Sequence, residues 1–65
     1  MSSPMTDLPR VGAPATRALH AAGHLTLASL AGVVAADLLA LHGVGPRAVR
    51  IINEALTAAG LPPLS

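Results

Sequence analysis

A short glycine turn that leads directly into a helix is the feature of this sequence most suggestive of chemistry. The turn spans residues 42–46 (HGVGP), and Arg47 and Arg50 lie in the first turns of the helix after it. Glycine permits positive φ and lets the backbone approach a bound group closely. The free N–H groups and the dipole of a helix start attract anions, and an arginine adds a charged hydrogen bond. The pattern therefore predicts an anion site.

A weaker copy of this pattern lies near the N-terminus. Sliding the chain by 33 residues places residues 8–12 (LPRVG) on residues 41–45 (LHGVG), with Arg10 where the second copy has Gly43. The match continues with Ala15 on Ala48, Arg17 on Arg50 and Ala22 on Ala55. Self-similarity at one period indicates two copies of one supersecondary unit. If both turns face one side, Arg10 and Arg17 widen the positive surface.

Turn residues divide the chain into short helices that position these groups. Pro14 suits a first helical turn, and Gly23, Gly32 and Gly60 mark helix ends. We predict helices over residues 14–22, 26–31 with Thr26 as N-cap, 35–41 and 46–59. The predicted core faces are Ala15, Ala18, Leu19 and Ala22 in the first helix, Leu38 and Leu41 in the third, and Ala48, Val49, Ile52, Leu56 and Ala59 in the last.

The composition limits both the fold and the function. A chain of 65 residues forms one small domain with a thin core. With 14 Ala and 11 Leu against seven Val and Ile, that core is predicted to be all-α. The absence of Cys excludes disulfides and thiolate zinc sites, and the absence of aromatic residues excludes stacking on bases. The net charge of +1 indicates no broadly basic surface.

The organisation along the chain is simple. Residues 1–6 are predicted to be a disordered lead, 7–61 the domain and 62–65 a short C-terminal tail. No secretory signal is recognisable. The stretch of residues 18–36 lacks charge but is broken by Gly23 and Gly32 and is apolar on faces only, so no membrane span is expected. A cytoplasmic location is the default expectation.

The residues from Leu41 to Arg47 (LHGVGPR), followed by Ala48 and Ile52, resemble the hairpin of helix-hairpin-helix DNA-binding proteins. The span from Leu8 to Leu61 also resembles the C-terminal domain of the bacterial RNA polymerase alpha subunit. The resemblance implies a compact all-α (HhH)2 or SAM-like domain of four to five helices, built from two pseudo-repeated helix-hairpin-helix units.

The same resemblance implies non-sequence-specific contact with the backbone of double-stranded DNA across a minor groove. The main-chain N–H groups of Gly43 and Gly45 are the implied phosphate donors. Pro14 stands about where the polymerase domain uses an arginine on DNA, so that contact is missing. The complete set of predicted phosphate-binding residues is Gly43, Val44, Gly45, Arg47, Ala48, Arg50, Gly12, Arg10 and Arg17.

Other chemistry finds little support in the sequence. His20 and His24 are four residues apart, but Gly23 ends the helix between them and no carboxylate is near, so no metal site is predicted. The carboxylates are scattered, and neither a nucleophile–base arrangement nor a paired carboxylate is present. We therefore expect no enzymatic activity and no cofactor.

Two alternatives stay open. The glycine turn is also compatible with a tight helix–helix connection that binds nothing, and the arginines with a solvated helix face. A second hypothesis is a homodimerisation or protein-interaction module, because a core this small lacks room for every apolar side chain. The apolar residues that are not all expected to fit in that core are Leu25, Leu27, Val33, Val34, Leu39 and Ile51.

Overall fold

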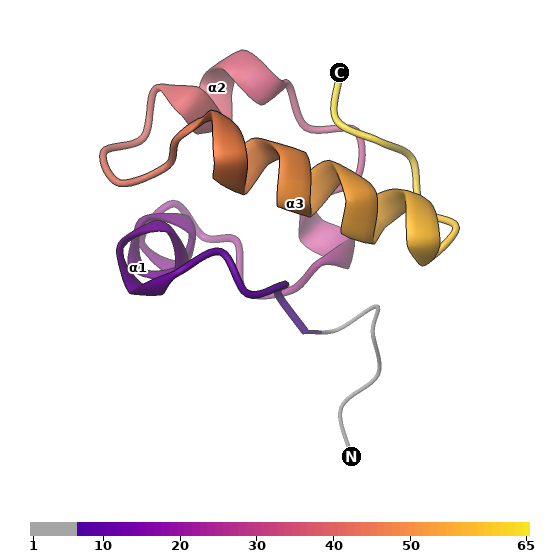
Figure 1. Cartoon of the computed structure of the whole chain (residues 1–65), viewed down its shortest axis with the longest axis horizontal. Helices are drawn as coiled ribbons and strands as arrows, with labels where there is room; N and C mark the ends of the chain where they lie inside the picture. The colour runs from indigo at the N-terminus through magenta and orange to yellow at the C-terminus, as the bar shows by residue number, and fades with distance from the viewer. Residues whose placement is uncertain (1–6) are drawn as a thin grey trace.

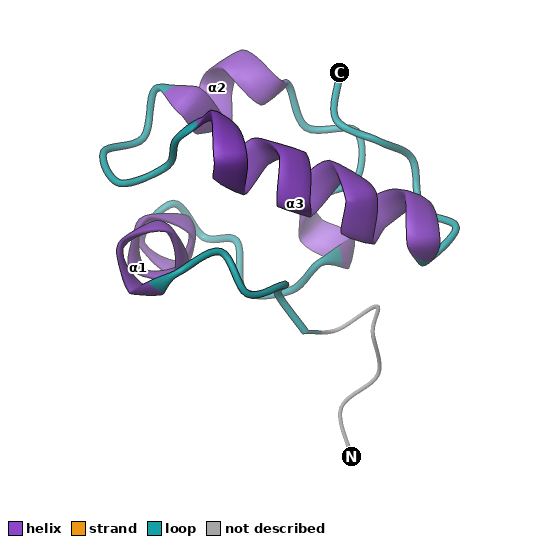
Figure 2. Cartoon of the chain, viewed as in Figure 1, coloured by secondary structure: helices purple, strands orange, loops and turns teal. Residues whose placement is uncertain are grey.

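The computed structural model of the protein describes residues 7–65, which contain four helical segments. The predicted disordered lead, residues 1–6, lies outside the described residues. The four segments are the α-helices α1 (Ala13–Ala21), α2 (Ala35–Leu39) and α3 (Pro46–Ala58) and the 3₁₀ helix η1 (Ala28–Leu30). Figure 2 shows helices and loops but no strand between residues 7 and 65. The all-α prediction is therefore confirmed for the described residues, which form three α-helices and one 3₁₀ helix, and the finer prediction of paired helix-hairpin-helix units stays a prediction.

Helices α1 and α3 each begin after a glycine, at positions 33 residues apart, but the φ of that glycine is 92° at Gly12 and −113° at Gly45. Gly12 and Gly45 are the N-caps, and a proline stands in each first turn. The Gly12 carbonyl accepts the Thr16 N–H at 3.0 Å, and the Gly45 carbonyl accepts the Val49 N–H at 3.1 Å. The equivalence stops near the helix ends, because α3 is longer. Ala22 lies beyond the end of α1 and is exposed, contrary to its predicted place in the core.

Both of these helices end at the predicted glycines. Gly23 after α1 has φ 89° and Gly60 after α3 has φ 73°. The next N–H in each case bonds back into the last turn, from His24 to the Leu19 carbonyl at 2.8 Å and from Leu61 to the Leu56 carbonyl at 2.9 Å. This is the Schellman arrangement, which requires a left-handed residue at the glycine position.

The two middle helices are shorter than predicted. The segment 26–31 is reduced to η1, which begins after Leu27. Thr26 Oγ1 accepts the Ser29 N–H at 3.2 Å, the bond expected of the predicted N-cap. The Ser29 hydroxyl donates to the Thr26 carbonyl at 2.6 Å, and the Leu30 N–H bonds to the Leu27 carbonyl at 2.9 Å, so the turn is 3₁₀ rather than α. Helix α2 ends at Leu39, and the Leu41 N–H closes a tighter turn onto the Leu38 carbonyl at 3.0 Å. Leu41 is consequently half-buried rather than fully buried.

The core lies where all four segments meet. Its five largest fully buried side chains are Leu19 from α1, Leu30 from η1, Leu38 from α2, and Ile52 and Leu56 from α3. The buried positions of α3 confirm most of its predicted face, while Val49 and Ala59 at the margin are half-buried. In Figure 1, α3 is seen lengthwise and α1 end-on, so the two helices cross steeply.

The last residues, predicted to be a tail, run back along the domain. The Ser65 N–H donates to the Val33 carbonyl and the Ala35 N–H donates to the Ser65 carbonyl, both at 2.9 Å. The side-chain oxygen of Asn53 accepts the Leu64 N–H at 3.0 Å. Figure 1 shows this C-terminal strip passing beside the segment that precedes α2. Within residues 7–65, no helix has the length and hydropathy that crossing a membrane requires.

Candidate functional site

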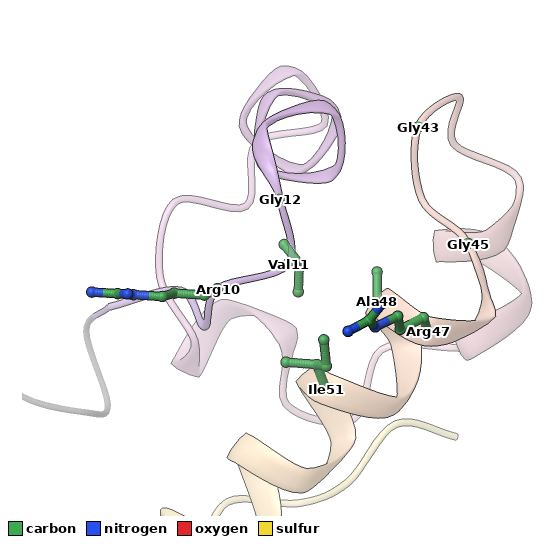
Figure 3. A pocket seen from close by; sticks show the side chains of 8 residues that line it. All are labelled: Arg10, Val11, Gly12, Gly43, Gly45, Arg47, Ala48 and Ile51. Atoms are coloured by element: carbon green, nitrogen blue, oxygen red, sulfur yellow. The ribbon is translucent and has the colours of Figure 1, made fainter.

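The two glycine turns border one open hollow on the surface, which we call the glycine hollow. Its volume is about 390 Å³. Its lining residues are Arg10, Val11 and Gly12 before and at the start of α1, and Gly43, Gly45, Arg47, Ala48 and Ile51 around the start of α3 (Figure 3). Six of the nine predicted site residues thus meet at one place, although the two turns are distant in the sequence.

Gly43 holds the second turn against the first turn of α1. Its φ is 99°, in the left-handed region. A Cβ placed there would lie 2.8 Å from the carbonyl oxygen of Pro14 and 3.2 Å from its carbonyl carbon. Glycine is therefore required at this position for two reasons, its own conformation and the direct backbone contact between the turns.

Gly45 differs from Gly43 in both respects. Its φ of −113° is an ordinary extended value, and a Cβ there would meet no atom within 4 Å. The expectation that this turn glycine also supplies positive φ is wrong for Gly45, since any residue adopts this conformation. The space beside Gly45 opens onto the glycine hollow, so the fold itself gives no reason for the missing side chain.

Several main-chain N–H groups around the hollow donate no hydrogen bond within residues 7–65. At the start of α3 these are the N–H groups of Gly45, Arg47 and Ala48. The N–H of Gly43, in the preceding turn, also donates no hydrogen bond within residues 7–65. Glycine has no side chain to cap a helix, so neither Gly12 nor Gly45 accepts a bond through a side chain from the first N–H groups of the helix that follows it. A helix start whose first N–H groups make no hydrogen bond carries a partial positive charge.

Val44 has a different role from its glycine neighbours. Its N–H is already bonded to the Leu41 carbonyl at 3.2 Å, and its side chain is part of the hydrophobic core. It therefore anchors the turn and does not line the hollow, contrary to the prediction that it contacts the anion.

The four predicted arginines are all exposed but lie in different places. Arg47 reaches toward the space between Ala48 and Ile51, whereas the Arg10 side chain extends away from the glycine turns (Figure 3). Arg17 does not line the hollow. Arg50 borders a separate depression with Asn53, Glu54, Thr57 and Ala58. The charge directed at the hollow is therefore smaller than the sequence suggests.

The predicted site did not include two side chains that line the hollow, Val11 and Ile51. Both are half-buried, and Figure 3 shows their side chains near that of Ala48. Ile51 had been assigned to the apolar excess, yet it lies one helical turn after Arg47, a spacing that places both side chains on one face. This spacing of four residues is the sequence signal that places Ile51 beside Arg47. Val11 had no such signal, because its counterpart in the second copy, Val44, belongs to the hydrophobic core.

The rest of the described surface shows little that resembles a catalytic or metal centre. Among residues 7–65, no three His, Cys, Asp or Glu side chains gather in a group able to hold a metal ion. His24 contacts the Ser29 hydroxyl through Nδ1 at 3.4 Å, which is a long and exposed contact. The glycine hollow consequently stands as the candidate site. No family model, curated protein or solved structure matches this chain.

Proposed function

We propose that the chain is a small DNA-binding module that holds the sugar–phosphate backbone in the glycine hollow. The observation that carries this proposal is the convergence on one hollow of the Gly12 turn, of Arg47, and of the start of α3, whose N–H groups on Arg47 and Ala48 donate no hydrogen bond within residues 7–65. Phosphate oxygens accept hydrogen bonds from helix N-termini and from arginine, which are common partners of the DNA backbone. The resemblance to helix-hairpin-helix proteins points the same way.

Binding of this kind is expected to ignore the base sequence. The side chains that line the hollow are two arginines and three apolar residues, and Arg47 lies at the start of α3, where we place a phosphate rather than a base edge. Phosphate contacts position a protein on the duplex without carrying sequence information directly. The expected target is therefore duplex DNA of any sequence, contacted across a minor groove.

The affinity is expected to be weak and dependent on salt. The net charge is only +1, and Arg47 is the arginine directed at the hollow. Each phosphate that a cation neutralises contributes about −0.9 to the slope of log K against log salt. Few contacts therefore mean a shallow slope, and tethering or a second copy would strengthen binding by avidity.

Arg47→Ala is expected to weaken binding to a labelled duplex about fivefold at low salt, equivalent to ~1 kcal/mol. The salt slope should become shallower by about one unit. Fluorescence anisotropy titrations at several salt concentrations measure both quantities.

Arg50→Ala is the matched control, because it removes the same charge from a neighbouring turn of α3 that does not border the hollow. We expect it to change the affinity less than twofold. Absence of binding at low salt, or equal losses in the two variants, would contradict a phosphate site at the hollow.

A second candidate function is self-association through exposed apolar side chains. Leu25, Val34 and Leu39 are 63%, 46% and 44% exposed, while Leu27 from the same predicted excess is buried. If these side chains form an interface, sedimentation velocity at high protein concentration should show a dimer that Leu39→Ser weakens. A monomer at every concentration would rule out self-association, and DNA binding would be unaffected by this result.

A further inference from the structure

Helix α2 has little of its own to hold it in place. It is five residues long, and the residue before it is Val34, which has no side-chain oxygen to accept the first N–H groups of the helix. An isolated helix of this length does not form in water, because ordering its first turn costs more than its hydrogen bonds gain. Contacts from other segments must therefore hold α2, and the buried Leu38 side chain provides one of them.

A second contact comes from Ser65 in the C-terminal strip, residues 61–65. Its main-chain oxygen accepts the Ala35 N–H, the first of α2, at 2.9 Å, and its own N–H donates to the Val33 carbonyl at 2.9 Å. The Ser65 hydroxyl also donates to the Gly32 carbonyl at 3.3 Å. The strip therefore satisfies the first N–H of α2, for which the residue before the helix offers no side-chain acceptor.

The strip is itself anchored on α3. The Leu64 N–H donates to the side-chain oxygen of Asn53 at 3.0 Å, and Leu61 and Leu64 are half-buried against the hydrophobic core. Both prolines between these leucines are exposed. Figure 1 shows the strip leaving the end of α3 and passing to the segment before α2. The strip consequently ties the start of α2 to α3.

Hydrogen bonds continue from α2 to the turn that borders the glycine hollow. The Leu38 N–H donates to the Val34 carbonyl at 3.4 Å, and the Leu41 N–H donates to the Leu38 carbonyl at 3.0 Å. The Val44 N–H in turn donates to the Leu41 carbonyl at 3.2 Å. Gly43, which lines the hollow, directly precedes Val44. The position of Gly43 therefore depends partly on α2, and the position of α2 depends partly on the strip.

From these bonds we infer that residues 61–65 are a latch that controls the glycine hollow. When the latch is docked, it bonds the first N–H of α2 and keeps the turn of residues 42–45 in order. When it is released, α2 and that turn open before α1 and α3 do, as a local unit of low stability. Release of the latch thus removes the hollow without unfolding the whole domain. This inference goes beyond the proposed function, because it concerns the order of the hollow and not its ligand.

Amide hydrogen exchange, resolved by residue with NMR, measures which segments open first. Asn53→Ala removes the acceptor of the Leu64 N–H, so the latch is released more often. A lost hydrogen bond of ~1 kcal/mol corresponds to about a fivefold change in an equilibrium, so the amides of Ala35, Leu41 and Val44 should exchange about fivefold faster. Amides whose exchange requires α1 or α3 to unfold should change no more than about twofold, because alanine is the better helix former and stabilises folded α3.

Two matched variants separate the hydrogen bond from other effects of the substitution. Asn53→Asp keeps a side-chain oxygen that accepts the Leu64 N–H, so its exchange rates should stay within about twofold of the parent. Glu54→Ala changes the next residue of α3, which is exposed and makes no hydrogen bond to residues 61–65. It should also leave the exchange rates of residues 35–44 within about twofold of the parent.

Three results would overturn the latch. Asn53→Ala could speed exchange equally in every helix, which would show that the strip stabilises the domain as a whole. The amides of residues 35–44 could keep the parent's exchange rates, which would show that α2 does not depend on the strip. Asn53→Asp could exchange as fast as Asn53→Ala, which would show that the bond to Leu64 is not responsible. None of these measurements involves DNA, so the latch and the proposed function can fail independently.

Discussion

Replacing Gly43 with alanine is expected to lower the free energy of unfolding by about 2–5 kcal/mol. A non-glycine residue in the left-handed region costs roughly 1–2 kcal/mol, and Gly43 has φ 99°. The new methyl group would also lie 2.8 Å from the Pro14 carbonyl oxygen. That oxygen belongs to the backbone of α1 and cannot rotate away, so the two turns must separate, at a further ~1–3 kcal/mol.

Thermal and urea unfolding followed by circular dichroism measure this loss. For a domain of this size each 1 kcal/mol shifts Tm by roughly 4–8 °C, so the effect is large. Gly45→Ala is the matched control, because φ is −113° there and a Cβ meets nothing within 4 Å. We expect Gly45→Ala to cost no more than about 1 kcal/mol, because alanine fits this backbone conformation and is only a poorer N-cap than glycine. Equal destabilisation by the two substitutions would show that the Gly43–Pro14 contact does not hold the turns together.

The helix starts and ends were predictable because their signals are local. A proline in the first turn and a glycine after the last turn describe α1 and α3 almost to the residue. The shift of 33 residues also anticipated that Gly12 and Gly45 hold equivalent places. Local chemistry misled at η1, where the Ser29 hydroxyl bonds to the Thr26 carbonyl and the turn is 3₁₀ rather than the predicted helix.

The candidate site was predictable in position but not in detail. Its glycines look alike in the sequence, yet Gly43 is required by the packing of α1 while Gly45 is not. That difference depends on which segments meet in space, which periodicity does not reveal. The direction of Arg10 and the burial of Val44 depend on packing in the same way. The family resemblance stays a prediction, and the binding experiments on Arg47 and Gly45 test its functional content.

Gly45→Asp is expected to stabilise the fold and to weaken DNA binding in the same protein. Gly45 is the N-cap of α3 in the extended conformation typical of that position, and it has no side-chain cap. An aspartate there would accept the N–H of Arg47 or Ala48 and face the positive end of the helix dipole, a gain of about 1 kcal/mol. Its charge would occupy the place proposed for a phosphate, so the affinity for duplex DNA should fall about 10- to 100-fold.

Gly45→Asn separates the effect of the negative charge from the effect of the N-cap hydrogen bond. It has nearly the shape of aspartate and also bonds the first N–H groups, so it should stabilise α3 by a few tenths of a kcal/mol. Without the charge, we expect only a few-fold loss of DNA affinity. Unfolding curves and anisotropy titrations on the same three proteins give both quantities. If Gly45→Asp stabilises the domain and binds DNA as the parent does, the phosphate does not lie at the start of α3. If it unfolds the domain, the absence of a side chain at Gly45 is a requirement of the fold rather than of a ligand.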